Sequence, residues 1–95
     1  MIKSFNDKDT EKIFRQEFAK RIPHNIARVA LRKLMMIDAA ETLTDLKVPP
    51  ANRLEPLHGD REGQWSIRIT DQWRIGFVPL SGGRESENVE IVDYH

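Results

Sequence analysis

The chain has 95 residues, which is enough for one small domain with a single hydrophobic core but not for two. It has no cysteine, so disulfides and thiolate metal sites are excluded and a reducing compartment is favoured, and its three scattered histidines do not form a zinc-binding set. Fifteen Lys and Arg residues balance fifteen Asp and Glu residues, so indiscriminate binding of nucleic acid is excluded and any RNA contact needs a local basic cluster.

The first residues are not typical of a signal peptide, and nothing later approaches the roughly 18 to 20 apolar residues of a membrane span. We therefore expect a cytoplasmic protein without a membrane partner, folded as one domain over residues 1–95. The apolar opening from Ile2 to Phe5 is compatible with an edge strand.

The next segment has the pattern of a helix that runs to about residue 21. Asn6 or Asp7 provides an N-cap, and carboxylates fill the first turn, where they favour the helix dipole. Apolar residues then recur every fourth position, at Phe14, Phe18 and Ile22. This spacing predicts one narrow buried stripe along the helix.

A second helix is predicted from Pro23 to about Ala40. Proline is tolerated in the first turn because the N–H group that it lacks would have no hydrogen-bond partner within the helix there. Its predicted core face consists of Ile26, Val29, Ala30, Leu34 and Ile37. Leu31, Met35 and Met36 widen the apolar arc beyond what one sheet covers. Two interpretations account for this wide apolar arc. The helix could be central, packed between the sheet and the first helix, or part of the arc could form a groove that binds a partner protein. Flexible Met side chains are typical of such binding surfaces.

The second half of the chain has the period of strands. Residues 42–53 are predicted to be a connection, because Pro49 and Pro50 cannot continue a helix. Alternating apolar residues then predict strands at 65–70 and 73–78, and residues 89–94 are rich in strand formers. Turns at 70–72 and 81–83 favour antiparallel hairpins. The fold class is α+β, with two N-terminal helices on a small antiparallel sheet in the order β-α-α-β-β-β-β.

One strand carries a candidate phosphate-binding side chain. Arg74 lies between Trp73 and Ile75, so strand alternation points it away from the face that those two residues bury. A guanidinium suits a phosphate, because its planar donors match two oxygens and its charge persists at any relevant pH. The alternative is an ordinary exposed arginine.

The chain ends on three side chains with possible chemical roles. His95 can act as acid or base because an imidazole titrates near pH 6.5, and Asp93 lies on the same side of the strand by alternation. Tyr94 faces the other way and could stack on a nucleobase or pack beneath the site. The alternatives are a frayed terminal histidine and a solvated acid.

Four segments together resemble the HigB toxins of the RelE superfamily. They are Leu54-Glu55-Pro56-Leu57-His58-Gly59-Asp60-Arg61, Gly63-Gln64-Trp65-Ser66-Ile67-Arg68-Ile69, Gln72-Trp73-Arg74-Ile75 and Val92-Asp93-Tyr94-His95. The opening residues 1–5 and residues 37–40 also fit, so the resemblance covers essentially the whole chain. It implies a ribosome-dependent messenger-RNA endonuclease that needs no metal or cofactor. It also implies a HigA-type helix-turn-helix antitoxin, through which alone the protein would contact DNA.

The resemblance also implies the residues of the site. Metal-free RNA cleavage needs a base for the ribose 2′-hydroxyl, cationic donors for the phosphate and an acid for the departing 5′-oxygen. The implied catalytic set is Glu55, His58, Arg74, Asp93, Tyr94 and His95. Glu55 and His58 depart from the family pattern, which has His and Lys at these places, and either could be the base. Arg53, Arg61 and Arg68 could line an RNA path or be solvated charges.

Two other functions fit the same fold, because function depends on the site and not on the scaffold. One is a non-catalytic toxin that resembles the ParE branch and binds DNA gyrase. The other is a degenerate toxin that only binds its antitoxin. Arg74 and the terminal Asp-Tyr-His favour the nuclease, since a binding module has little reason to keep them together.

Overall fold

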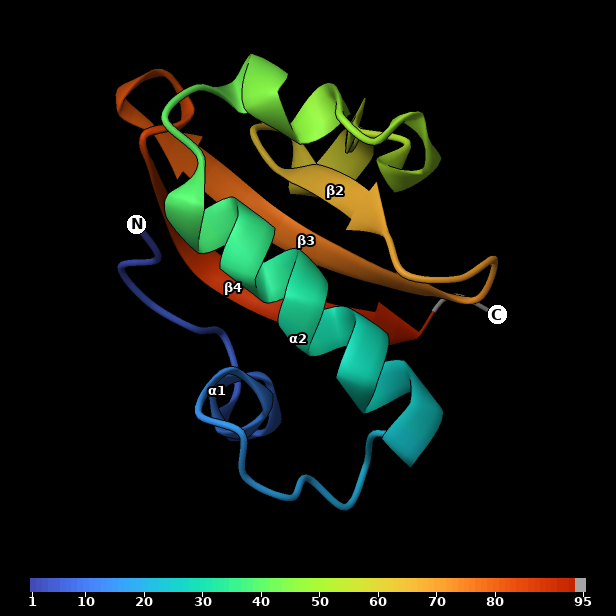
Figure 1. Ribbon diagram of the computed structural model, residues 1–95. Helices are drawn as coiled ribbons and strands as arrows, with labels where there is room; N and C mark the ends of the chain where they lie inside the picture. Colours follow the sequence, from blue (N-terminus) through green and yellow to red (C-terminus); the bar gives the residue numbers. More distant parts are fainter. Residues whose placement is uncertain (94–95) are drawn as a thin grey trace.

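The computed structural model describes residues 1–93, in which two helices pack on a four-stranded antiparallel sheet. The helices are α1 (Lys8–Phe14) and α2 (His24–Ala39), and the strands are β1 (Glu55–Pro56), β2 (Trp65–Arg68), β3 (Trp73–Leu80) and β4 (Glu85–Asp93). Each strand pairs with the next along the chain, in the order β1-β2-β3-β4 (Figure 1). The predicted α+β class and the consecutive hairpins are therefore confirmed.

The N-terminal segment runs beside β4 without forming a regular strand. Two isolated bridges join it in parallel to that strand, between Ile2 and Ser86 and between Phe5 and Val89. The predicted edge strand is thus reduced to two points of pairing, and they place the start of the chain against the last strand of the sheet (Figure 1).

Helix α1 is shorter than the sequence indicates. Its predicted N-cap is confirmed, because the Asp7 carboxylate accepts a hydrogen bond from the Thr10 amide at 2.6 Å. The helix ends at Phe14, however, and Gln16 adopts a left-handed conformation with φ of 63°. The predicted extension to residue 21 is therefore wrong, and Phe18, which was expected in the buried stripe, is 83% exposed.

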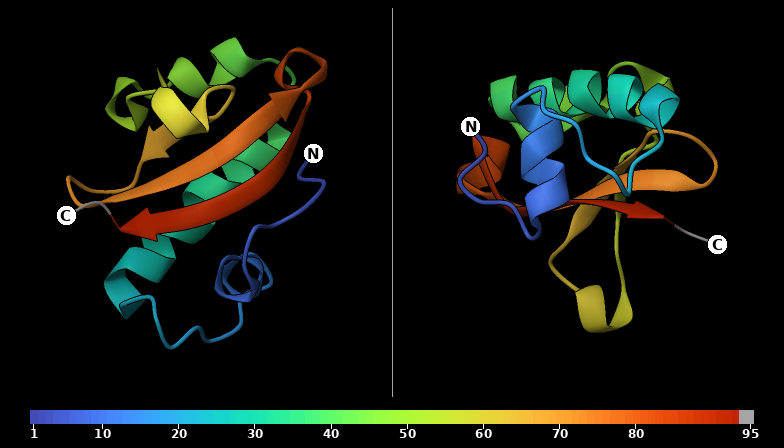
Figure 2. Two further views of the ribbon diagram at one scale, coloured as in Figure 1. Left: turned by 180° about the vertical axis from the view of Figure 1, so that it is seen from behind. Right: turned by 90° about the horizontal axis from the view of Figure 1, so that it is seen from below.

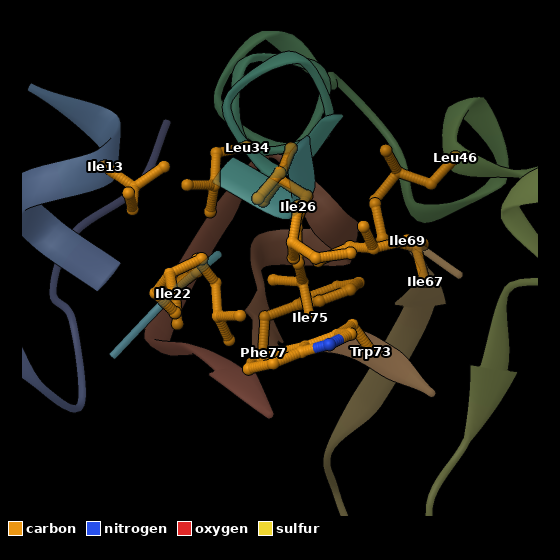
Figure 3. Close-up of a cluster of buried hydrophobic side chains, with 14 of the residues drawn as sticks. Ile13, Ile22, Ile26, Leu34, Leu46, Ile67, Ile69, Trp73, Ile75 and Phe77 are labelled. Atoms are coloured by element: carbon orange, nitrogen blue, oxygen red, sulfur yellow. The ribbon is translucent and has the colours of Figure 1, made fainter. Parts of the chain in front are cut away.

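Helix α2 supplies the central layer of the core. Four of its five predicted core residues, Ile26, Ala30, Leu34 and Ile37, are buried, whereas Val29 is only half-buried. They face a row of isoleucines that runs across three strands, in which Ile67 pairs with Ile75 and Ile75 pairs with Ile91. Figure 3 shows Ile26 and Leu34 of the helix facing Ile67 and Ile75 of the sheet. The interpretation of α2 as a central packed helix is confirmed.

In the part of the chain that the structure describes, no α-helix covers the other face of the sheet. Figure 2 shows α1 and α2 on one side of the sheet and the segment around residues 59–61 extending from the opposite side. We call the face away from the helices the outer face.

Within residues 1–93, no helix is long and apolar enough to cross a membrane.

Candidate functional site

Two rows of side chains are placed on the outer face by strand register. Because side chains alternate along a strand, the neighbours of the buried Ile67–Ile75–Ile91 row point the opposite way. One row is Glu55, Ser66, Gly76 and Glu90, and the other is Arg68, Arg74 and Val92. The predicted outward direction of Arg74 follows directly from this register.

Arg74 is held in one position by three oxygen atoms. Its Nε donates to the Ser66 hydroxyl at 2.9 Å, and its Nη2 donates to the main-chain carbonyl of Arg53 at 2.7 Å. The same Nη2 lies 4.0 Å from a carboxylate oxygen of Glu55. The Arg74 side chain is only 16% exposed, so it is fixed by its surroundings and is not an ordinary mobile surface arginine.

Two more of the predicted arginines gather near Arg74. Arg68 is its direct cross-strand partner and forms an ion pair of 2.6 Å with Asp71. The hydrogen bond and charge of Arg68 lower the pKa of the Asp71 carboxyl, and the charge of Arg53 lowers it further. Arg53, Arg68 and Arg74 therefore form a local basic cluster on a chain whose net charge is zero, as RNA contact would require.

Glu55 is the predicted base that the structure brings to Arg74. Its carboxylate is 57% exposed and therefore accessible to a substrate. His58 is exposed at the start of the 3-10 turn Gly59–Arg61, and within residues 1–93 the structure has no hydrogen bond between its side chain and Arg74.

Arg61 is not part of the basic cluster. Its guanidinium forms an ion pair of 3.2 Å with Glu90, whose other carboxylate oxygen accepts from the Asn6 side chain at 2.7 Å. Glu90 is the cross-strand partner of Gly76, so this pair lies on the outer face, beside the Arg74 row. Arg61 is therefore paired with an acid, as Arg68 is with Asp71, but unlike Arg68 it is not a cross-strand partner of Arg74.

Of the three predicted C-terminal site residues, the structure describes one, Asp93, at the end of β4. Asp93 pairs across the strands with Trp73, which places it in a row of the helix-side face and not in the row of Arg74. Its carboxylate accepts from the side-chain amide of Gln72 at 3.0 Å. The other two predicted terminal residues, Tyr94 and His95, lie outside the described residues.

Several residues that hold the site were missed in the sequence. No sequence pattern singles out Ser66, although the tight turn at 70–72 sets a register in which it faces the same side as Arg74. Lys33 belongs to a residue type that is almost always exposed, yet it is 5% exposed and donates a hydrogen bond to the buried Asn52. No local pattern indicates that pair, because it joins segments nineteen positions apart.

Comparison with known proteins gives the fold and the family. A solved YoeB/ParE toxin from Agrobacterium tumefaciens aligns with a TM-score of 0.51 and 21% identity, covering 99% of this chain and 96% of that one, which shows the fold. This chain therefore shares the architecture of that solved toxin.

The sequence itself matches a narrower group. The family model described as "RelE-like toxin of type II toxin-antitoxin system HigB" matches residues 3–95. The chain is 39% identical to Toxin HigB-1 of Vibrio cholerae over 83 residues, which cover 86% of this chain and 87% of that protein. It is 36% identical to Endoribonuclease HigB of Proteus vulgaris over the full length of both. The chain therefore belongs to the HigB family of RelE-like toxins of type II toxin–antitoxin systems.

Proposed function

We propose that this toxin is a ribosome-dependent endonuclease that cleaves messenger RNA by metal-independent acid–base catalysis and so inhibits translation in the cytoplasm. The observation that carries the proposal is the guanidinium of Arg74, fixed by Ser66 and the Arg53 carbonyl on the outer face of the sheet with the exposed Glu55 carboxylate at 4.0 Å. A relative that is similar over its whole length is named an endoribonuclease, which supports the same activity here.

The reaction divides into three roles. A carboxylate or imidazole removes the proton of the ribose 2′-hydroxyl, and the 2′-oxygen then attacks the phosphorus and displaces the 5′-oxygen. Arg74 offsets the negative charge that builds on the phosphate in the transition state. His95 protonates the departing 5′-oxygen with Tyr94 beside it, whereas Asp93, whose row faces the helices, takes no direct part in the reaction. Arg53 and Arg68 bind phosphates on either side of the scissile bond, and Arg61 joins them when it leaves Glu90.

The position of Glu55 makes it the stronger candidate for the base. We expect Glu55→Gln to lower the rate of RNA cleavage by about 10²-fold. The glutamine side chain keeps the shape of the glutamate, but its amide cannot accept the proton of the 2′-hydroxyl. His58→Gln should have a smaller effect, since within residues 1–93 no hydrogen bond joins the His58 side chain to Arg74, whereas Glu55 lies 4.0 Å from it. Single-turnover cleavage of a defined message on programmed ribosomes measures both, and a larger loss for His58→Gln would give the role of base to His58.

Dependence on the ribosome is tested by comparing substrates. Purified toxin should cut a message on translating ribosomes and leave the same naked RNA intact, and mapped 5′ ends should fall within translated codons. Equal cutting of naked RNA would remove the ribosome from the proposal. Intact messages together with DNA damage after induction would instead support a gyrase-binding toxin.

The second proposed partner is a helix-turn-helix antitoxin of the HigA type. Opposite the outer face, Ile13, Ile22 and Leu31 line an apolar hollow of about 320 Å³, together with Phe18. A second hollow shares Leu31 and continues over Met35 and Met36. We call Phe18, Leu31, Met35 and Met36 the helical surface. Arg28 and Arg32 flank it, so we propose that an acidic, apolar segment of the antitoxin docks there.

Antitoxin binding should respond to one charge on this surface. We expect Met35→Glu to weaken binding by at least about 10-fold, because it places a carboxylate in the apolar contact. The matched control is Val48→Glu, at an apolar side chain that is 72% exposed and outside the helical surface. Calorimetric titration with the antitoxin measures both variants, and equal affinities would move the docking site elsewhere.

A further inference from the structure

Lys33 is a lysine buried where a charge is costly. It lies in α2, is only 5% exposed, and donates from Nζ to the side-chain oxygen of Asn52, which is itself fully buried. Burial lowers the pKa of Lys33, and the positive charges of Arg32 and Arg68 lower it further. A buried amine without a hydrogen-bond partner is strongly destabilising, so the burial of Lys33 depends on its hydrogen bond to Asn52.

Asn52 stabilises residues 46–52, which lie in the connection between α2 and the sheet. Its side-chain nitrogen donates to the carbonyls of Leu46 at 3.1 Å and Val48 at 3.4 Å. These bonds fold the segment 46–52 around one amide, and Lys33 joins that amide to α2. The position of the next residue, Arg53, is therefore set from within the core.

Arg53 links this connection to the side chain of Arg74. Its backbone is left-handed, with φ of 45° and ψ of 58°, and this conformation accompanies the turn from the buried Asn52 to the exposed Arg53. Its carbonyl accepts the 2.7 Å hydrogen bond from Arg74 Nη2. A continuous series of contacts thus runs from Lys33 through Asn52 and Arg53 to the guanidinium.

We propose that Lys33 and Asn52 are positioning residues for Arg74: they fix the Arg53 carbonyl and thereby the direction in which the guanidinium meets the phosphate. The catalytic part of this inference depends on the proposed nuclease function, whereas the effect on Arg74 does not. Neither residue contacts the substrate. Their loss should lower the turnover number by about 10- to 100-fold with little change in KM, because a small misplacement of a catalytic group has an effect of that size.

A double-mutant cycle separates positioning from general destabilisation. Cleavage is measured for Lys33→Met, Arg74→Ala and the double variant, with Lys47→Met as the control at an exposed lysine of the same connection. If Lys33 acts through Arg74, the double variant should be no slower than Arg74→Ala alone. A further 10- to 100-fold loss in the double variant would show that Lys33 acts by another route and would overturn the proposal.

A second measurement needs no activity. In nitrogen-15 NMR spectra of the folded variants, the guanidinium protons of Arg74 should exchange with solvent faster in Lys33→Met than in the wild type. The Nε proton of Arg21, which donates to Asp9 at 3.2 Å, is an internal reference and should not change. Unchanged exchange at Arg74 in a folded variant would refute positioning. If Lys33→Met does not fold, Lys33→Gln, which retains a polar group but is too short to keep the contact, is used with the same criteria.

The two proposals fail in different ways. A wild type that does not cut RNA, combined with faster Arg74 exchange in Lys33→Met, would refute the nuclease and leave the Lys33–Asn52–Arg53–Arg74 linkage standing. A wild type that cuts RNA, combined with unchanged exchange, would leave the nuclease and refute the linkage.

Discussion

Arg74→Ala should lower the rate of RNA cleavage by about 10³-fold, which is the scale of loss when a fixed donor to a transition-state anion is removed. The side chain is already desolvated to 16% exposure and oriented by Ser66 and the Arg53 carbonyl, so it requires little reorganisation when the phosphate gains charge. Its charge is also the central member of the basic cluster. Cleavage of a message on translating ribosomes, measured by primer extension, tests the variant.

Two companion variants show whether geometry or charge matters. Arg74→Lys keeps the charge but loses the planar set of donors, so we expect it to remain at least about 10-fold below the wild type. Arg84→Ala removes an exposed arginine outside the outer-face rows and should cleave normally. Cleavage by Arg74→Ala at the wild-type rate would remove Arg74 from the mechanism.

The sheet could be predicted from the sequence because its signals are local. Strict alternation around Ile67 and Ile75 specifies which side chains face the helices, and the turn at 70–72 specifies which residues pair. Helix α1 shows the limit of the same reasoning. The spacing of Phe14 and Phe18 fits a helical stripe, but Gln16 turns left-handed and releases the chain, so Phe18 points into solvent.

The site was less predictable than the fold because its supports are long-range. The outward direction of Arg74 follows from alternation alone. The Arg74 side chain is held by a backbone carbonyl twenty-one positions away. Neither the composition nor the periodicity of the sequence indicates that contact. The placement of Asp93 likewise depends on the register of β4 against β3, which puts Val92 and not Asp93 opposite Arg74.

The largest stability effect is expected at Gly83, in the connection between β3 and β4. Its φ of 102° is unfavourable for any other residue, and an added Cβ would lie 2.2 Å from the Leu43 nitrogen and 2.7 Å from the Leu43 Cα. Both are backbone atoms at the start of the 3-10 helix Leu43–Lys47, which the capping box of Thr42 and Asp45 fixes. Gly83→Ala should therefore reduce the free energy of unfolding by about 2 to 5 kcal/mol, from left-handed strain and overpacking together.

The neighbouring glycine is the matched control. Gly82 also has a positive φ, of 73°, but an added Cβ there meets nothing within 4 Å, so Gly82→Ala should cost only about 1 kcal/mol of backbone strain. Urea unfolding followed by circular dichroism gives both values. If the two variants are equally stable, the connection at residues 81–83 does not pack against Leu43. A large difference would establish the close approach that ties the β3–β4 connection to the segment leading towards Asn52 and Arg53.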